Sequence, residues 1–266
     1  MPMTAKKKET ECERMAELIT SRTNPLMTHI RKLASSRSYR REHGEYIGDG
    51  VKLLEEAVKW DALLTAVVYT KGTPLPPLKE TVRVVEVPED LMRSISPMEA
   101  PQGALFAARL PEQTLPDTLD GKRYLALEGV QDPGNVGTIL RTADAYEADG
   151  VILLEGCADL YNPQTVRSTM GALFRIKAWN TTLEQLCAVL RAAKLPLMGA
   201  ALREDTVDAR EADLRHGVIL IGSEGKGLTD AALAACDKTI RIPMSERCES
   251  LNAAIAAATL LWEGYR

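Results

Sequence analysis

The sequence is poor in the residues that build disulfide frameworks, metal centres and histidine-dependent catalytic sites. Its 266 residues include three histidines, of which His216 alone lies in the C-terminal half. Five cysteines are scattered without any Cys-x-x-Cys pair, at Cys12, Cys157, Cys187, Cys236 and Cys248. An odd number without that spacing argues against a disulfide framework and a zinc knuckle. The scarcity of histidine argues against a His-rich metal site and a histidine-activated nucleophile.

The sequence also lacks long apolar runs. None reaches the roughly 18 residues that span a bilayer, and the N-terminal MPMTAKKKETECERM has no apolar core of a signal peptide. A cytoplasmic location is therefore the default expectation. Apolar content of 45% and charged content of 26% are ordinary for a soluble globular protein. The length suffices for one large or two ordinary domains.

Two common nucleotide-binding signatures are absent. The turn after an apolar stretch at residues 124–130 reads PGNVGT, without the G-x-G-x-x-G of dinucleotide-binding folds. Glu155 lies about where an acid that binds a ribose hydroxyl would lie, so a nicotinamide-dependent oxidoreductase stays as the weaker alternative. In GSEGKGL (222–228), Gly227 follows the lysine where a phosphate-binding loop needs serine or threonine. These glycines indicate backbone folded around a flat ligand, or simply a tight turn.

The basic residues are unevenly placed. The net charge of −4 argues against indiscriminate nucleic-acid binding. Residues 20–41 nevertheless contain no acid and hold Arg22, Arg31, Lys32, Arg37, Arg40 and Arg41. Such a run is compatible with a solvated helix face. It is also compatible with an arm that contacts phosphates, whose binding weakens with salt, and Tyr39 could add a stacking surface.

The segment LPEQTLPDTLDG, residues 110–121, is rich in proline and acid and is typical of a linker. It separates an N-terminal tail and small α/β domain (1–109) from a C-terminal domain (122–266). In the first domain we expect helices over 24–38, 52–60 and 90–96, and strands over 63–70, 81–87 and 103–109.

The C-terminal domain alternates apolar runs with helical patterns. Apolar runs predict strands buried on both faces at 124–130, 150–156, 174–180, 195–202, 217–223 and 239–244. Helical patterns lie between most of them, at 136–147, 163–171, 182–193 and 228–236. This alternation predicts an α/β fold with a parallel sheet and helices on either side. The final SLNAAIAAATLLWEGYR predicts a helix whose alanines suit a tight helix–helix contact or an ordinary core position.

Three polar, mostly glycine-containing segments follow predicted strands of this domain. QDPGNVGTILR follows the first strand, GSEGKGL the fifth, and PMSERCESLN the sixth. In an open parallel sheet, ligands bind beyond the carboxyl ends of the strands. We therefore expect these three segments to form the functional site.

Together the three segments resemble a known family. NVGTILRTADAYEADGV, ILIGSEGKGL and IRIPMSERCESLNAAIAAA are similar, in this order, to the three motifs of the SpoU–TrmH family of RNA 2′-O-ribose methyltransferases. The resemblance covers the C-terminal domain. Upstream, NPLMTHIRKLASSRSYRREHGEYIGDGVKLLEEAV resembles the small α/β RNA-binding domain of many members.

The resemblance implies a fold, a cofactor and partners. It implies a trefoil knot, in which the C-terminal chain threads through a loop, although knotted chains are rare. It also implies a homodimer, S-adenosylmethionine as methyl donor, no metal, and ribosomal rather than transfer RNA as substrate because of the N-terminal domain. The donor pocket is implied at Ala200, Gly222, Ile242, Met244 and Leu251. Candidate RNA contacts from the basic run are Arg22, Arg31, Lys32, Arg40 and Arg41.

The resemblance further implies an active site made of Asn135, Arg141, Glu224, Ser250 and Asn252. We expect Asn135 at or near a helix N-cap, Glu224 to orient it, and Gly137 to leave room for Arg141 to reach the strand ends. Family proposals make the residue at the position of Arg141 the base that removes the ribose hydroxyl proton. Guanidinium pKa values above about 12 conflict with that role, so Arg141 either loses its proton transiently or only positions the ribose and phosphate.

The sequence departs from the family in three places. Tyr146-Glu147 stands where members usually carry Phe-Gly, the segment SERCE (245–249) lacks a common glycine, and Asp49 replaces a glutamate. These changes lie beside the reacting positions and affect loop shape and substrate fit more than activity. A catalytically idle RNA-binding protein is the other alternative, against which the five intact active-site matches argue. A transfer RNA substrate also stays open.

Overall fold

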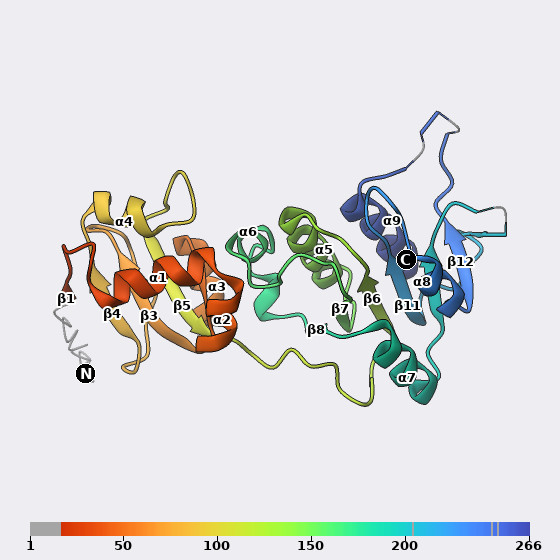
Figure 1. The fold of residues 1–266 in the computed structure, drawn as a ribbon, viewed down its shortest axis with the longest axis horizontal. Coiled ribbons are helices and arrows are strands. Elements are labelled where there is room, and N and C mark those ends of the chain that lie inside the picture. The colour runs from red at the N-terminus through yellow and green to blue at the C-terminus, as the bar shows by residue number, and fades with distance from the viewer. Residues whose placement is uncertain (1–16, 204, 246, 249) are drawn as a thin grey trace, which may run out of the picture.

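The computed structural model describes residues 17–203, 205–245, 247–248 and 250–266. Cys12 and the N-terminal segment considered for a targeting signal lie outside the described residues. The chain forms two β-sheets that follow one another along the long axis of the molecule, each with its own helices (Figure 1). The segment between them is not a free tether, because Leu115 and Leu119 are buried in the core of the second sheet.

The first sheet is mixed, with the order β1-β4-β3-β5-β2. Its strands are β1 (Glu17–Leu18), β2 (Glu45–Asp49), β3 (Leu64–Tyr69), β4 (Arg83–Glu86) and β5 (Ala104–Arg109). Its helices are α1 (Pro25–Ser35), α2 (Arg37–His43), α3 (Val51–Lys59) and α4 (Glu89–Ile95). Helices α1 and α4 cover one face of the sheet, while α3 packs on the other. The three predicted strands are confirmed, and β1 and β2 are additional.

The predicted helix over 24–38 is wrong in its extent. Ser36 has an extended backbone that ends α1, and its hydroxyl accepts a hydrogen bond from the Tyr39 amide to start α2. The sequence pattern did not predict strand β2, because its sequence EYIGD includes a glycine and has a charged residue at each end. A β-carbon on Gly48 would lie 2.2 Å from the Phe106 ring of β5, so the glycine admits that ring.

The second sheet is entirely parallel, as predicted, with the order β10-β12-β9-β11-β6-β7-β8. Its strands are β6 (Arg123–Leu127), β7 (Gly150–Leu153), β8 (Ala178–Asn180), β9 (Leu197–Ala200), β10 (Val207–Asp208), β11 (Gly217–Ile221) and β12 (Lys238–Arg241). The predicted strand over 174–180 is only partly correct. Its first residue lies in the short 3-10 helix η1 (Ala172–Phe174), and β8 starts four residues later, at Ala178.

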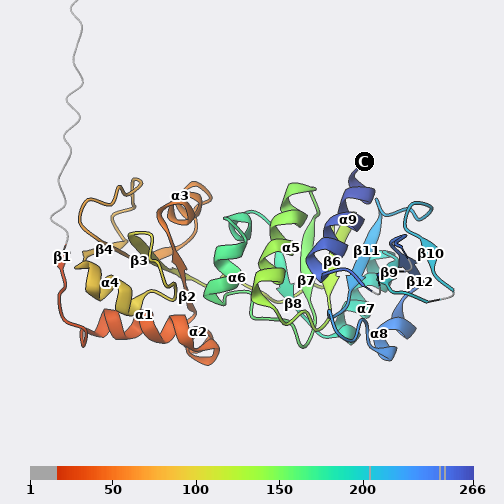
Figure 2. The ribbon, with the colours of Figure 1, turned by 90° about the horizontal axis from the view of Figure 1, so that it is seen from above.

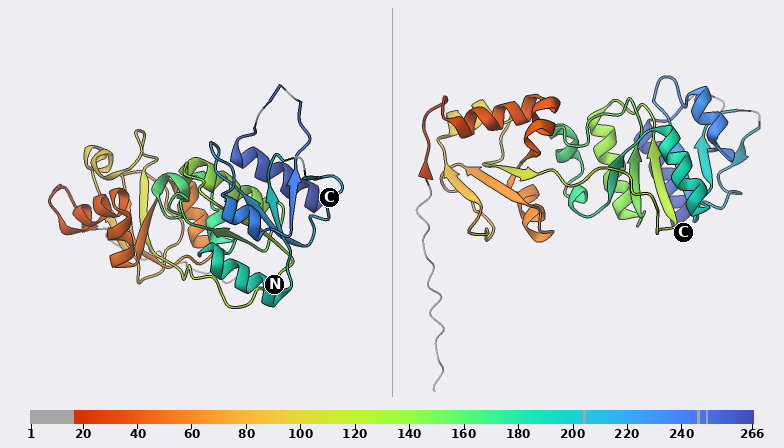
Figure 3. Two further views of the ribbon diagram at one scale, coloured as in Figure 1. Left: turned by 45° about the vertical axis from the view of Figure 1, so that its right-hand side comes forward. Right: turned by 60° about the horizontal axis from the view of Figure 1, so that its bottom comes forward.

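Helices cover both faces of this sheet, as the alternation predicted (Figures 2 and 3). One face carries α5 (Pro133–Ala145), α6 (Pro163–Ser168) and α9 (Ala253–Tyr265). The other carries α7 (Leu183–Ala193) and α8 (Asp230–Ala235). Helix α6 lies between the first domain and α5 (Figures 1 and 2). It contacts β2 of the first domain and α5 of the second.

One arginine fixes the carboxyl ends of α5 and α9 together. Arg123 donates a hydrogen bond of 2.6 Å to the carbonyl of Gly264 and another to the carbonyl of Tyr146. A cation suits this place because the last carbonyls of a helix carry partial negative charge. Because their last turns are joined, α5 and α9 also keep a fixed position relative to each other at their first turns, which lie at the carboxyl edge of the sheet.

The two domains are joined by buried and half-buried ion pairs. Arg40, only 3% exposed, donates through Nε (3.2 Å) and Nη2 to Asp159, in the loop after β7. Arg175 bridges Glu56 of α3 and Asp144 of α5. The prediction of Arg40 as an RNA contact is therefore wrong, because its guanidinium is buried and committed to the domain contact.

Candidate active site

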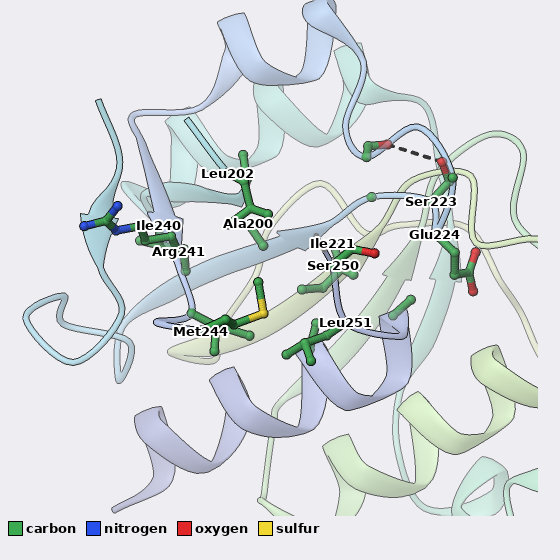
Figure 4. A pocket seen from close by; sticks show the side chains of 17 residues that line it. Ala200, Leu202, Ile221, Ser223, Glu224, Ile240, Arg241, Met244, Ser250 and Leu251 are labelled. Carbon is green, nitrogen blue, oxygen red and sulfur yellow. Dashed lines mark hydrogen bonds between the residues drawn. The ribbon is translucent and has the colours of Figure 1, made fainter. Parts of the chain in front are cut away.

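The loops that follow β9, β11 and β12, together with the start of α9, form a pocket of about 360 Å³ (Figure 4). All five residues predicted to bind the methyl donor line this pocket: Ala200, Gly222, Ile242, Met244 and Leu251. Leu202, Ile221 and Arg241 also line it and were not predicted from the sequence. Each of these three ends a strand or follows one by two residues, so the strand-end rule could have identified them.

The loop at residues 222–228 folds back on itself. Ser223 and Gly227 exchange backbone hydrogen bonds of 3.1 and 3.0 Å, and Gly227 has a φ of +68° that favours glycine. A β-carbon on Gly222 would lie 2.3 Å from the carbonyl carbon of Gly227. Gly222 therefore has to be glycine for the loop to close, and its backbone stays open to the pocket.

Asn135 connects three segments that are far apart in the sequence. Its Nδ2 donates to Glu224 at 2.6 Å, and its Oδ1 accepts from Asn252 Nδ2 at 3.2 Å. Glu224 belongs to the loop after β11, and Asn252 is the N-cap of α9, where its own Oδ1 accepts from the Ala254 and Ile255 amides. This bridge is the contact expected of a glutamate that orients Asn135.

Asn135 lies in the first turn of α5, near the N-cap as predicted, but the capping role predicted for it is wrong. Helix α5 starts at Pro133, and the carboxylate of Asp132 accepts the hydrogen bond from the Asn135 amide at 2.7 Å. Because Asp132 caps the helix, the Asn135 side chain is released for the bridge to Glu224 and Asn252. Ser250 also lies at the pocket, as predicted, and is exposed.

Arg141 lies on the exposed side of α5 and is not among the pocket-lining residues. Its side chain makes no hydrogen bond or ion pair with any residue that the structure describes. The role expected of Gly137 is wrong, because this residue is buried against α6. A β-carbon there would lie 2.5 Å from Ser168 Cβ and 2.6 Å from the Thr165 carbonyl oxygen. Gly137 thus permits close packing of two helices.

Cys157 lies four residues after the end of β7. Burial raises the pKa of the Cys157 thiol to about 11, so it stays protonated and donates to the Leu127 carbonyl oxygen. Among the described residues, no three His, Cys, Asp or Glu side chains are grouped closely enough to hold a metal ion. In the same part of the chain, no helix has the length and apolar character to cross a membrane.

The other basic candidates differ in availability. Arg22 pairs with exposed Asp90 at 3.3 Å, and Arg31 donates to the backbone carbonyls of Met27 and Arg22. The remaining two are exposed: Lys32 lies 5.3 Å from the centre of the Tyr39 ring, and Arg41 has no partner among the described residues.

Tyr39 is less open than a stacking surface would need to be. Its ring also stacks on His43 with centroids 3.8 Å apart, and its hydroxyl lies 2.9 Å from His29 Nδ1. With Lys32 beside the ring as well, the prediction of Tyr39 as a stacking surface has little geometric support.

Comparison with known proteins identifies the family. Residues 122–262 match the SpoU rRNA Methylase family, and residues 24–106 match the MRM3-like substrate binding domain. The 23S rRNA (guanosine(2553)-2′-O)-methyltransferase RlmP of Bacillus subtilis is 30% identical over 92% of this chain and 97% of the relative. The 23S rRNA (uridine(2479)-2′-O)-methyltransferase of Streptomyces viridochromogenes is 31% identical, over 94% and 92% of the two chains.

Crystal structures give the same result. The AdoMet-bound rRNA methyltransferase from Sinorhizobium meliloti superposes with a TM-score of 0.83 at 31% identity, over 94% of this chain and 97% of that one. The SpoU methyltransferase AviRb from Streptomyces viridochromogenes, in complex with AdoMet, gives 0.82 at 28%, over 91% and 97%. This chain belongs to the SpoU rRNA methylase family. The family resemblance is confirmed and the nicotinamide alternative is wrong, while the trefoil knot stays a prediction.

Proposed function

We propose that this protein transfers the methyl group of S-adenosylmethionine to a ribose 2′-hydroxyl of ribosomal RNA. The observation that carries the proposal is the pocket at the carboxyl ends of β9, β11 and β12, whose lining residue Glu224 is joined through Asn135 to Asn252 by hydrogen bonds. Two relatives named as 23S rRNA 2′-O-methyltransferases match more than nine-tenths of both chains. The trefoil knot is part of the proposal, since the loops that would form it line the pocket.

The pocket suits the methyl donor. Backbone groups around Gly222 offer partners to the edge of an adenine, while Ile242, Met244 and Leu251 offer apolar cover for its faces. In the reaction a ribose oxygen attacks the methyl carbon, the carbon–sulfur bond breaks, and the hydroxyl proton is released. The leaving thioether is neutral, so the enzyme needs alignment more than stabilisation of an anion.

The polar residues have separate roles in aligning the ribose with the methyl donor. Asn135, held by Glu224 and Asn252, fixes the start of α5 beside the pocket, and Ser250 offers a hydroxyl near the ribose. Arg141 is about one and two-thirds turns further along α5 than Asn135, exposed and unpaired among the described residues. Since guanidinium groups keep their proton in proteins, we propose that Arg141 binds the phosphate next to the target ribose.

Gly222→Ala should weaken S-adenosylmethionine binding by at least about tenfold, because the added carbon forces the loop at residues 222–228 open. Gly225→Ala is the matched control within the same loop, since a β-carbon there meets nothing within 4 Å. Titration calorimetry measures both affinities. Gly225 also lines the pocket, so wild-type affinity in Gly222→Ala is the result that would show that the donor does not bind against this loop.

Arg141→Ala should lower methyl transfer to ribosomal RNA by at least about a hundredfold while leaving donor affinity unchanged. Transfer of a labelled methyl group from the donor to 23S rRNA measures the rate. Arg191→Ala, an exposed arginine on α7 across the sheet, serves as control. Wild-type activity in Arg141→Ala would refute the assignment, and so would a loss confined to donor binding.

The N-terminal domain supplies the proposed RNA contacts. Replacing Arg22, Arg31, Lys32 and Arg41 with glutamine should weaken RNA binding and flatten its salt dependence, by up to about 0.9 in the log–log slope for each lost phosphate contact. The control removes four other exposed cations of the same domain, Lys52, Lys71, Lys79 and Arg83. An unchanged slope in the first variant, or the same loss in both, would make the basic run an ordinary solvated face.

We also propose a homodimer formed through α9. This helix exposes three large side chains, Ile255 (54%), Trp262 (50%) and Tyr265 (46%), and the last two lie against Tyr146 at the end of α5. Exposed apolar groups gathered in one place are typical of a protein–protein contact.

Trp262→Glu should convert the dimer to a monomer, because it places an unpaired charge in an apolar contact. Leu18→Glu, at a leucine of the first sheet that is more exposed (63%) than Trp262, should leave the dimer intact. Sedimentation equilibrium distinguishes the two states. A wild-type monomer, or a Trp262→Glu dimer, would exclude this interface.

A further inference from the structure

A second cavity, of about 390 Å³, lies at the contact between the two domains. It is bounded by the turn before β3, the end of β5 and the segment between η1 and β8, and it shares no residue with the pocket at the strand ends. Its volume is within the range of small-molecule sites, about 300–1,000 Å³. Its walls are unusually aromatic for this chain and include Tyr46, Trp60, Tyr161, Phe174 and Trp179.

Two tyrosine hydroxyls in this cavity have no partner. Tyr46 is 3% exposed and Tyr161 is 4% exposed, and their rings pack 4.7 Å apart across the domain contact. Neither hydroxyl forms a hydrogen bond with any described residue. Neither is sealed from solvent, because the buried side-chain atoms without a partner in the described chain are Asp49 Oδ1 and Arg123 Nε.

Such hydroxyls are ready to bind a ligand. Both hydroxyls reach solvent and have no hydrogen-bond partner among the described residues, so a ligand can bind them without breaking a hydrogen bond inside the protein. Burial raises the pKa of both tyrosines, so each keeps its proton and can donate as well as accept.

Two cations at this cavity are weakly engaged. Arg109 lies 3.6 Å from Glu45, and Lys177 lies 3.8 Å from Asp120. The two cationic side chains are 56% and 62% exposed. Glu45 is only 11% exposed, and Arg109 also donates to the His43 carbonyl at 3.4 Å. Both contacts of Arg109 and the Lys177 pair are long and therefore weak, so both cations can turn to an incoming anion. The flat aromatic walls suit the face of a nucleotide base, and the two hydroxyls suit its polar edge. The two available cations suit the adjoining phosphates.

We propose that this cavity binds an unstacked base of the RNA substrate, with Arg109 and Lys177 on the neighbouring phosphates. This inference rests on the proposed function for the identity of the RNA. The acids Asp61 and Glu112 also line the cavity, and they disfavour a free nucleotide with several phosphate charges over a phosphodiester with one. Because Tyr46 and Tyr161 come from different domains, the site exists only while the domains are docked.

The kinetic test uses Tyr46→Phe combined with Tyr161→Phe, which removes the hydroxyls and keeps the rings. The KM for RNA should rise about tenfold, with kcat and the donor affinity unchanged. Tyr69→Phe, at a half-buried tyrosine of β3 whose hydroxyl lies near Glu86, is the matched control and should behave as wild type. An unchanged KM in the double variant, or an equal rise in the control, overturns the proposal.

The binding test does not depend on methylation. The chain has three tryptophans, so Trp262→Phe protein retains only Trp60 and Trp179, both of which line the cavity. A short single-stranded RNA should quench their fluorescence, and the double tyrosine variant should reduce that quenching. Quenching by uridine or adenosine monophosphate but not by the RNA would make the cavity a free-nucleotide site and overturn the proposal. A wild-type protein that methylates no ribosomal RNA, but whose tryptophans the RNA still quenches, would refute the proposed function alone.

Discussion

The candidate site depends on one amide side chain, that of Asn135, which holds three distant loops together. It donates to Glu224 after β11 and accepts from Asn252 at the start of α9. Because Asp132 caps α5, Asn135 is free to make both bonds. At their far ends the same two helices share Arg123. Both ends of α5 and α9 are thus fixed, and the pocket between the loops has a defined shape before any ligand binds.

Ion pairs also hold the first domain against the domain that carries this pocket. Arg40 and Asp159 hold α2 against the loop after β7, and Arg175 joins α3 to α5. The proposed basic face on α1 and α2 is therefore held in a fixed position relative to the start of α5. Ribosomal RNA is large enough to contact that face, the pocket at the strand ends and the aromatic cavity between the domains together. Two domains joined by such ion pairs suit a substrate recognised more by shape than by local sequence.

The sequence predicted the parts of the structure that depend on local pattern. Apolar runs separated by helical patterns were enough for the parallel sheet, and the rule that ligands bind at strand ends located the loops around Gly222 and Leu251. Position 147, where members of the family usually carry glycine, is occupied here by Glu147. Its φ of +54° is a conformation that favours glycine. The predictions that failed concern contacts between residues that are distant in the sequence. Arg40 and Asp159 are 119 positions apart, and Gly137 is small because of a helix that packs on it from outside its own element. No periodicity encodes either contact.

The pocket at the strand ends is proposed to carry out methyl transfer to a ribose of ribosomal RNA. A map of ribose methylation in total RNA, from cells with and without this protein, tests it most directly. The account predicts that 2′-O-methylation disappears from a defined ribosomal RNA nucleotide and returns with the wild-type chain. A ribosomal RNA methylation pattern identical in both cell lines, or a loss confined to transfer RNA, would contradict it.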